Sequence, residues 1–182
     1  PFNFSSSLSC SFNLGFISKL LIYAINPIKK SKSISDLSAI RKSKKIISEG
    51  GSVAIFPEGN VSYDGQTSLI NPSIVKLVRL LGVPVIILKS RGLYLSNPRW
   101  SIYNKRGKAT SYIDKIISKD DYVNMSDDAL FKLIKESLYV NAYEDQLVDK
   151  TKFKGKKIAH GLERLIFMDL DSEVPFVTYS YK

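Results

Sequence analysis

The sequence of 182 residues contains a single cysteine, Cys10, and a single histidine, His160. One cysteine excludes an intramolecular disulfide and is too few for a cysteine-rich zinc ribbon. A lone histidine with no placed partner is a weak signal for metal binding or acid–base catalysis. We therefore expect no metal site, and we expect His160 to have a structural or surface role.

Long hydrophobic runs are also lacking. The longest, residues 16–25, has ten residues and is interrupted by Ser18 and Lys19. A membrane-spanning helix needs about 20 apolar residues. The serine-rich residues 3–13 lack the basic region and the small-residue cleavage site of a secretory signal. The sequence thus predicts no transmembrane helix, and a protein that is cytoplasmic or lies at a membrane surface.

Basic residues exceed acidic ones. Lys and Arg number 27 and Asp and Glu number 17, which gives a formal net charge of +10. Such an excess attracts nucleic acid, an anionic membrane or a phosphorylated small molecule, and charge alone does not select among them. Hydrophobic residues make up 44% of the sequence, so its composition is that of a folded domain and not of a disordered chain.

The pattern of apolar residues predicts an α/β protein. A strand, a helix and a strand follow one another with short connections, which is typical of a βαβ unit with a right-handed crossover. We expect a single domain in which helices flank a central, mostly parallel or mixed sheet. The predicted helices cover residues 14–25, 35–48, 71–81, 126–138 and a short stretch around 159–167, and the predicted strands cover residues 52–56, 83–88, 100–103 and 109–117.

Local signals fix several of these boundaries. Ser35 and Ser126 are expected N-caps, Asn71-Pro72 is a typical helix start, and Gly82 is a typical helix end. The strands at 52–56 and 83–88 are short and mostly apolar, so we expect them to be buried.

The string Phe-Pro-Glu-Gly-Asn-Val-Ser at residues 56–62 is the most informative for function. It places Glu58 at the carboxyl end of a strand, where open α/β sheets bind ligands. Gly59 allows the backbone to approach a ligand closely, and Asn60 and Ser62 add hydrogen-bonding groups. An ordinary βα turn with a solvated glutamate explains the same residues, and physical reasoning alone leaves both interpretations open.

The same string resembles a conserved block of the glycerolipid acyltransferases, the family of lysophosphatidate and glycerol-3-phosphate acyltransferases, in which a strand ends in Phe-Pro-Glu-Gly. Residues 27–30 (PIKK) are similar to the preceding block of that family, and residues 82–86 (GVPVI) to the following one. Residues 92–100 (GLYLSNPRW) look like one bacterial branch of these proteins. The resemblance covers roughly residues 14–145.

This resemblance implies transfer of an acyl group from a thioester of coenzyme A or acyl carrier protein to a hydroxyl of a glycerol phosphate or lysophospholipid, without a further cofactor. It assigns Glu58 and Gly59 to the acceptor site, and Lys30 to the acceptor phosphate. Asn60 and Ser62 would be secondary polar contacts. The helix from residue 72 would add its positive N-terminus. The implied partners are the acyl thioester, the acceptor and an anionic membrane, and the implied location is the cytoplasmic, inner face of a membrane, as a peripheral protein of phospholipid biosynthesis.

The sequence departs from the pattern of the family in three places. The first block of the family, a His and an Asp separated by four residues, supplies the catalytic base and is absent here. His160 does not recreate it, because Leu165 stands five positions later. We interpret Pro1-Phe2 as the residues directly after a lost block, so we expect an amino-terminally incomplete acyltransferase with no identifiable catalytic residue. In addition, Val61 and Lys30 stand where the family has arginine, which changes the expected phosphate contacts.

Two basic segments leave alternatives open. Seven Lys or Arg residues lie between positions 29 and 45 against one acid, and they form either a collar for phosphate and membrane or a solvated helix face. Residues 150–157 (KTKFKGKK) open a basic extension, so we divide the chain into an acyltransferase-like domain, 1–145, and a C-terminal extension, 146–182. The alternative functions are a non-catalytic glycerophospholipid-binding domain and a basic nucleic-acid-binding protein. No recognisable nucleic-acid module accompanies the charge, so nucleic acid is not an expected partner.

Overall fold

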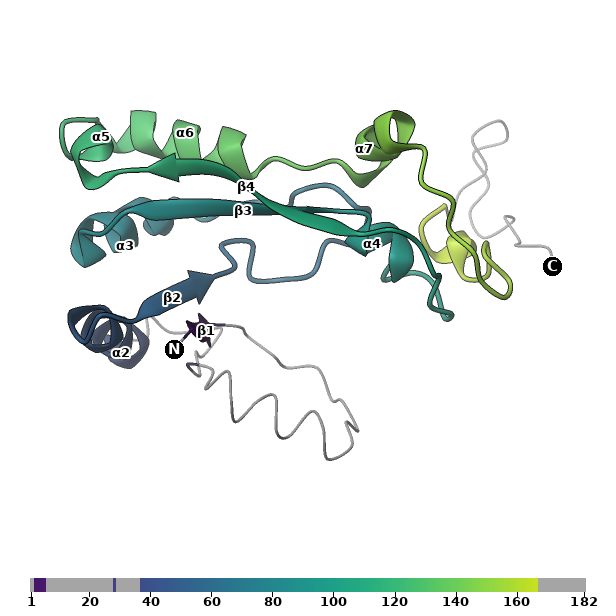
Figure 1. The fold of residues 1–182 in the computed structure, drawn as a ribbon, viewed down its shortest axis with the longest axis horizontal. Helices are drawn as coiled ribbons and strands as arrows, with labels where there is room; N and C mark the ends of the chain where they lie inside the picture. Colours follow the sequence, from purple (N-terminus) through teal and green to yellow (C-terminus); the bar gives the residue numbers. More distant parts are fainter. Residues whose placement is uncertain (1, 6–27, 29–36, 167–182) are drawn as a thin grey trace.

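A computed structural model describes residues 2–5, 28 and 37–166. This part of the chain is α/β, as predicted, and Figure 1 shows the β3–β4 ladder crossing the middle of the molecule, with α5 and α6 above it and β1, β2 and α2 below. The predicted helix at 14–25, the N-cap Ser35, Lys30 and Cys10 lie outside the described residues. The elements are β1 (Phe2–Ser5), α2 (Leu37–Ser48), β2 (Ser52–Ile55), α3 (Ser73–Leu81), β3 (Val85–Arg91), α4 (Leu93–Ser96), β4 (Thr110–Ile117), α5 (Lys119–Val123), α6 (Asp127–Leu138), α7 (Ala142–Asp149) and a 3-10 turn at Leu162–Arg164.

The strands form two ladders in the described part of the chain, and not the single central sheet that we expected. β1 pairs with β2 in parallel, whereas β3 pairs with β4 in antiparallel orientation with a register shift after Ile87. The order strand, helix, strand from β2 through α3 to β3 is as predicted, but β2 and β3 hydrogen-bond to different partners. β2 has only four residues because Pro57, which has no N–H group, follows closely.

The predicted strand at 100–103 is wrong, because these residues form a turn around buried aromatic and proline side chains. Pro98 is fully buried, and its carbonyl accepts a hydrogen bond from the Ser101 N–H at 2.9 Å. The Trp100 ring is 5% exposed and lies under the Lys105 ammonium, 4.2 Å from Nζ to the ring centre. Because these side chains are buried, residues 100–103 form a turn and no strand. β4 pairs with β3.

The core lies between α3, α6 and one face of the β3–β4 ladder. It is formed by Val75, Val78, Ile87, Ile117, Tyr122, Leu130 and Ile134. The opposite face of the ladder is open: Ile86 and Leu88 are 58% and 62% exposed, and their cross-strand partners Ile116 and Ile113 are 61% and 56% exposed. The expectation that 83–88 is a buried strand is therefore wrong, since only one face is covered by the described elements. The expectation for 52–56 is also wrong, because no residue of β2 is buried.

The predicted helix ends are mostly confirmed. Asn71 Oδ1 accepts the Ser73 N–H at 2.9 Å, and Gly82 ends α3 with a φ of 62°. The Ser126 hydroxyl accepts the Ala129 N–H at 3.2 Å and begins α6. In place of the short helix expected around 159–167, the structure has the 3-10 turn at Leu162–Arg164. The short helices α4, α5 and α7 were not predicted.

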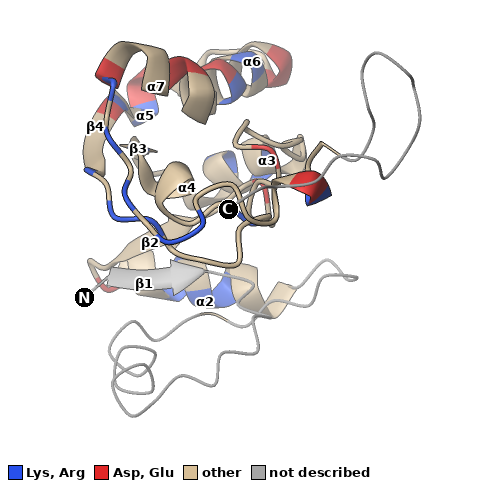
Figure 2. Cartoon of the chain, turned by 90° about the vertical axis from the view of Figure 1, so that its right-hand side faces the viewer, with Lys and Arg blue, Asp and Glu red and all other residues tan. Residues whose placement is uncertain are grey.

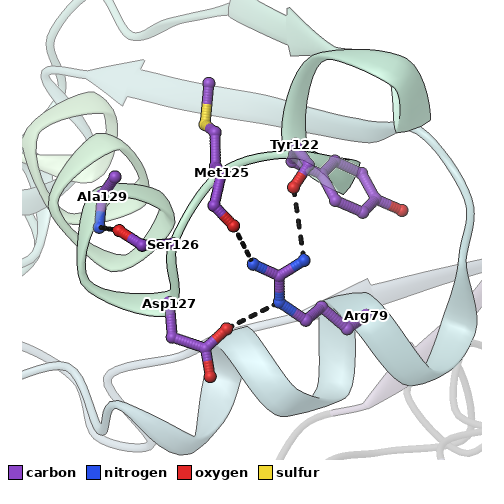
Figure 3. A network of polar contacts seen from close by, with 6 residues as sticks. All are labelled: Arg79, Tyr122, Met125, Ser126, Asp127 and Ala129. Carbon is purple, nitrogen blue, oxygen red and sulfur yellow. Dashed lines mark hydrogen bonds and ion pairs between the residues drawn. The ribbon is translucent and has the colours of Figure 1, made fainter.

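Arg79 joins α3 to the connection between α5 and α6 (Figure 3). Its Nε pairs with Asp127 Oδ1 at 2.7 Å, while its terminal nitrogens donate to the carbonyls of Tyr122 and Met125. The Tyr122 hydroxyl in turn donates to the Val83 carbonyl at 3.0 Å. These bonds connect α3, and the segment between α3 and β3, to α5 and to the connection that follows it.

Residues 146–166, the described part of the segment that we assigned to a C-terminal extension, contact the rest of the chain. Arg106 and Lys154 exchange two backbone hydrogen bonds, at 2.6 and 2.8 Å, and the Phe153 ring covers Gly107. Arg91, at the end of β3, pairs with Asp145 and Asp149 of α7 at 3.3 and 3.6 Å. Across the described ranges, none of the helices has the length and apolar character required to cross a membrane.

Candidate functional site

The Phe56–Ser62 loop follows the carboxyl end of β2 and lies at the surface. The Gly59 N–H donates to the Phe56 carbonyl at 3.1 Å, which closes a tight turn. Gly59 has a φ of 69°, a conformation that a residue with a Cβ adopts only with strain. An added Cβ there would meet no atom of the described residues within 4 Å.

Glu58 is half-buried and does not extend freely into solvent. Its Oε2 accepts a hydrogen bond from the Ser68 N–H at 2.7 Å. This bond joins the turn to the segment that leads into α3, so the carboxylate holds the loop in place. Its other oxygen can accept a further hydrogen bond.

Ser62 uses its hydroxyl within the loop. Its Oγ accepts the Gly65 N–H at 2.9 Å and donates to the Gln66 carbonyl at 2.7 Å. Ser62 therefore shapes the turn that follows, whereas Asn60 and Val61 are exposed. Lys30, which the sequence assigns to phosphate, lies outside the described residues. The N-terminus of α3 has one of its N–H groups engaged by Asn71.

A second segment, residues 92–100, holds this loop from the side. The Tyr94 hydroxyl donates to the Tyr63 carbonyl at 2.7 Å, and the Tyr94 ring fills the space beside Gly65. Arg99 Nη1 donates to the Val61 carbonyl at 3.3 Å, with its guanidinium carbon 5.8 Å from the centre of the Tyr63 ring. Sequence reasoning assigned no role to Tyr63, Tyr94 or Arg99. The only available signal was that the string 92–100 accompanies the Phe-Pro-Glu-Gly block in the resemblance.

Burial changes the pKa of two further groups, the Tyr94 hydroxyl beside the loop and the Lys105 ammonium over the Trp100 ring. Burial, together with the neighbouring Tyr143, raises the pKa of the Tyr94 hydroxyl above its usual range, so this group remains a hydrogen-bond donor. Burial lowers the pKa of the Lys105 ammonium, which lies over the Trp100 ring; the residue as a whole is 9% exposed. Both directions follow from the cost of removing a charged group from water.

His160 lies near the C-terminal end of the described residues, and its neighbours there do not form a catalytic arrangement with it. Its ring makes an edge-on contact with Tyr103, with 5.7 Å between centroids, and its buried Nδ1 has no hydrogen-bond partner among the described residues. Within residues 2–5, 28 and 37–166, no group of three or more His, Cys, Asp or Glu side chains is placed to hold a metal ion.

No protein-family model, characterised protein or solved structure matches the chain.

Proposed function

We propose that the chain has the function of a glycerolipid acyltransferase: an acyl group passes from a thioester of coenzyme A or acyl carrier protein to a hydroxyl of a lysophospholipid or glycerol phosphate. The observation that carries this proposal is the Phe-Pro-Glu-Gly turn at the exposed carboxyl end of β2, with Glu58 anchored to Ser68 and Gly59 at positive φ. In such a site the anchored loop positions the acceptor against the acyl donor, which lowers the entropic part of the barrier.

The distribution of basic and acidic residues supports binding of an anionic ligand on one side of the molecule. Figure 2 shows Lys and Arg along α2 and along the segment that enters β4, while Asp and Glu gather on α6 and α7. The basic residues of the segment that enters β4 are Arg99, Lys105, Arg106 and Lys108. A phosphate group and an anionic lipid surface are both attracted to such a side.

A direct assay tests this function. Purified chain is incubated with labelled acyl-CoA or acyl carrier protein thioester and lysophosphatidate, and phosphatidate is measured by chromatography. The assay uses the 182-residue chain and a form with an added amino-terminal His-x4-Asp segment. We expect product from the extended form, and we expect Glu58→Gln to lower its rate, whereas Glu136→Gln on the exposed side of α6 leaves it unchanged. Absence of product from both forms contradicts the proposal.

The second candidate is a domain that binds glycerophospholipid without turning it over. The position of His160, packed edge-on against Tyr103, favours this candidate for the chain as given. It predicts saturable binding of lysophosphatidate with no phosphatidate formed by either form of the chain. A Glu58→Ala variant that binds lysophosphatidate as tightly as the parent would remove this candidate.

A further inference from the structure

Arg99 is the best-positioned cation beside the loop, and it differs from the other anchored arginines in its partners. Arg79 pairs with Asp127, and Arg91 pairs with Asp145 and Asp149. For Arg99 no carboxylate lies within ion-pair distance in the part of the chain that the structure describes. Its charge is therefore not neutralised by these residues.

The geometry of Arg99 fixes where this charge lies. One N–H donates to the Val61 carbonyl at 3.3 Å, and the guanidinium stands over the Tyr63 ring, so these two contacts orient the exposed Arg99 side chain toward the loop. A guanidinium has five N–H donors in a planar fork. Since one of them meets Val61, the others remain to form a pair of parallel hydrogen bonds with two oxygens of one anion.

The acids of the loop do not compete for these donors. Glu58 Oε2 accepts the Ser68 N–H at 2.7 Å, and Asp64 Oδ1 accepts the Gln66 N–H at 3.1 Å. Each carboxylate is thus turned toward the backbone of its own segment. An arginine that neutral partners orient, and that forms no ion pair with a carboxylate of the described residues, is suited to bind an anion from outside the chain.

We propose that Arg99 is an anion-binding residue of this site and holds the phosphate monoester group of the ligand that occupies the Phe56–Ser62 loop. The proposal rests on the proposed function insofar as the ligand is a glycerophosphate. The same chemistry is offered by inorganic phosphate, by glycerol 3-phosphate and by lysophosphatidate. The three compounds therefore serve as separate arms of the test.

The test is titration calorimetry of the full chain at fixed ionic strength with each compound, on the parent, Arg99→Lys and Arg99→Gln. Lysine keeps the charge and loses the fork, whereas glutamine keeps an N–H donor for the Val61 carbonyl and loses the charge. We expect Arg99→Gln to weaken glycerol 3-phosphate binding at least about tenfold and Arg99→Lys to weaken it less. Lys135→Gln removes one exposed charge from α6 as a matched control and is expected to change affinity less than roughly twofold.

The outcomes separate this inference from the proposed function. If the parent binds glycerol 3-phosphate and Arg99→Gln binds it equally well, the role of Arg99 is overturned and the acceptor assignment stands. Equal losses in Arg99→Lys and Arg99→Gln, with lowered melting temperatures in both, also overturn it, because they indicate a purely structural clamp. Arg99-dependent binding of inorganic phosphate alone supports the inference and contradicts the acceptor assignment. Absence of binding in all three arms overturns both.

Discussion

Gly59 and Gly65 have similar backbone conformations but different surroundings. Their φ values are 69° and 85°, so a side chain is strained at both positions. At Gly59 an added Cβ meets no atom of the described residues within 4 Å, whereas at Gly65 it would lie 2.6 Å from Tyr94 Cε1. We expect Gly59→Ala to cost about 1–2 kcal/mol of unfolding free energy from strain alone. Gly65→Ala should cost more, by about 1–3 kcal/mol.

Urea denaturation of both variants measures this difference. The Tyr94→Leu background serves as the control, because a smaller side chain there relieves the crowding at Gly65 and leaves the backbone strain. In that background the two glycine substitutions should have nearly equal costs. Equal costs in the parent background would show that the Tyr94 ring moves aside and does not fix the loop.

At the scale of the element, α5 begins with a reciprocal cap that depends on pH. The Ser118 hydroxyl accepts the Asp121 N–H at 3.2 Å, and the Asp121 carboxylate accepts the Ser118 N–H at 2.8 Å. These hydrogen bonds lower the pKa of Asp121 below its usual value. Because the folded-state pKa is the lower one, the stabilisation is complete above the unfolded pKa of about 3.9 and is lost as the pH falls through the folded pKa.

We therefore expect Asp121→Asn to melt at a lower temperature than the parent at neutral pH. The difference should shrink as the pH falls below about 4, because the parent carboxylate is then protonated as well. Melting curves by circular dichroism between neutral and acidic pH measure it. Asp120→Asn, in the same turn and without the reciprocal bond, is the matched control. A difference between parent and Asp121→Asn that persists at the lowest pH would contradict a role for the charge.

A second prediction for an element concerns the two faces of the β3–β4 ladder. Ile86 and Ile87 are neighbours in sequence, yet they are 58% and 3% exposed because side chains alternate across a strand. We expect Ile87→Ala to cost about 2–5 kcal/mol, since it leaves a cavity against α6. Ile86→Ala should cost about 0.5 kcal/mol or less. Urea denaturation compares the two, and a large cost for Ile86→Ala would show that its face is covered in solution.

The elements also show how far the sequence could predict this fold. Helix ends were predictable at Ser126, Asn71 and Gly82, because a cap is decided by residues within one turn. Strand pairing and strand burial were not predictable from the sequence. The apolar run 83–88 has the same composition whether one face of the strand is covered or both are. The strand expected at Trp100 failed because tertiary burial outweighed local β-propensity.

The candidate site also has a part that the sequence predicts and a part that it does not. An exposed turn at Glu58 and Gly59 follows from the residues Pro, Glu and Gly at the end of a strand. The contact of Arg99 with Val61 joins residues 38 apart in sequence. No local pattern encodes such a separation, so this part of the site required the structure.

For the whole molecule, the decisive property is that the net charge of +10 is unevenly spread. Acidic residues gather on α6 and α7, and α2 carries an outward basic group (Figure 2). This α2 group consists of Arg41, Lys42, Lys44 and Lys45, all of them exposed. A basic residue near an anionic membrane contributes about 1 kcal/mol to binding. If the chain acts at a membrane surface, α2 is therefore expected to face the lipid.

Replacing the four residues of the α2 group by glutamine should reduce binding to phosphatidylserine-containing vesicles by a factor on the order of 100–1,000, since each lost charge removes about 1 kcal/mol. The control replaces Lys119, Lys132 and Lys135 on α5 and α6, where acidic residues lie nearby, and should have a much smaller effect. Vesicle sedimentation at low and high salt measures both, because electrostatic binding weakens as salt screens it. Equal losses in the two variants would mean that net charge, and not the α2 group, attracts the chain. Displacement of the bound chain by duplex DNA at equal phosphate concentration would favour nucleic acid as its partner.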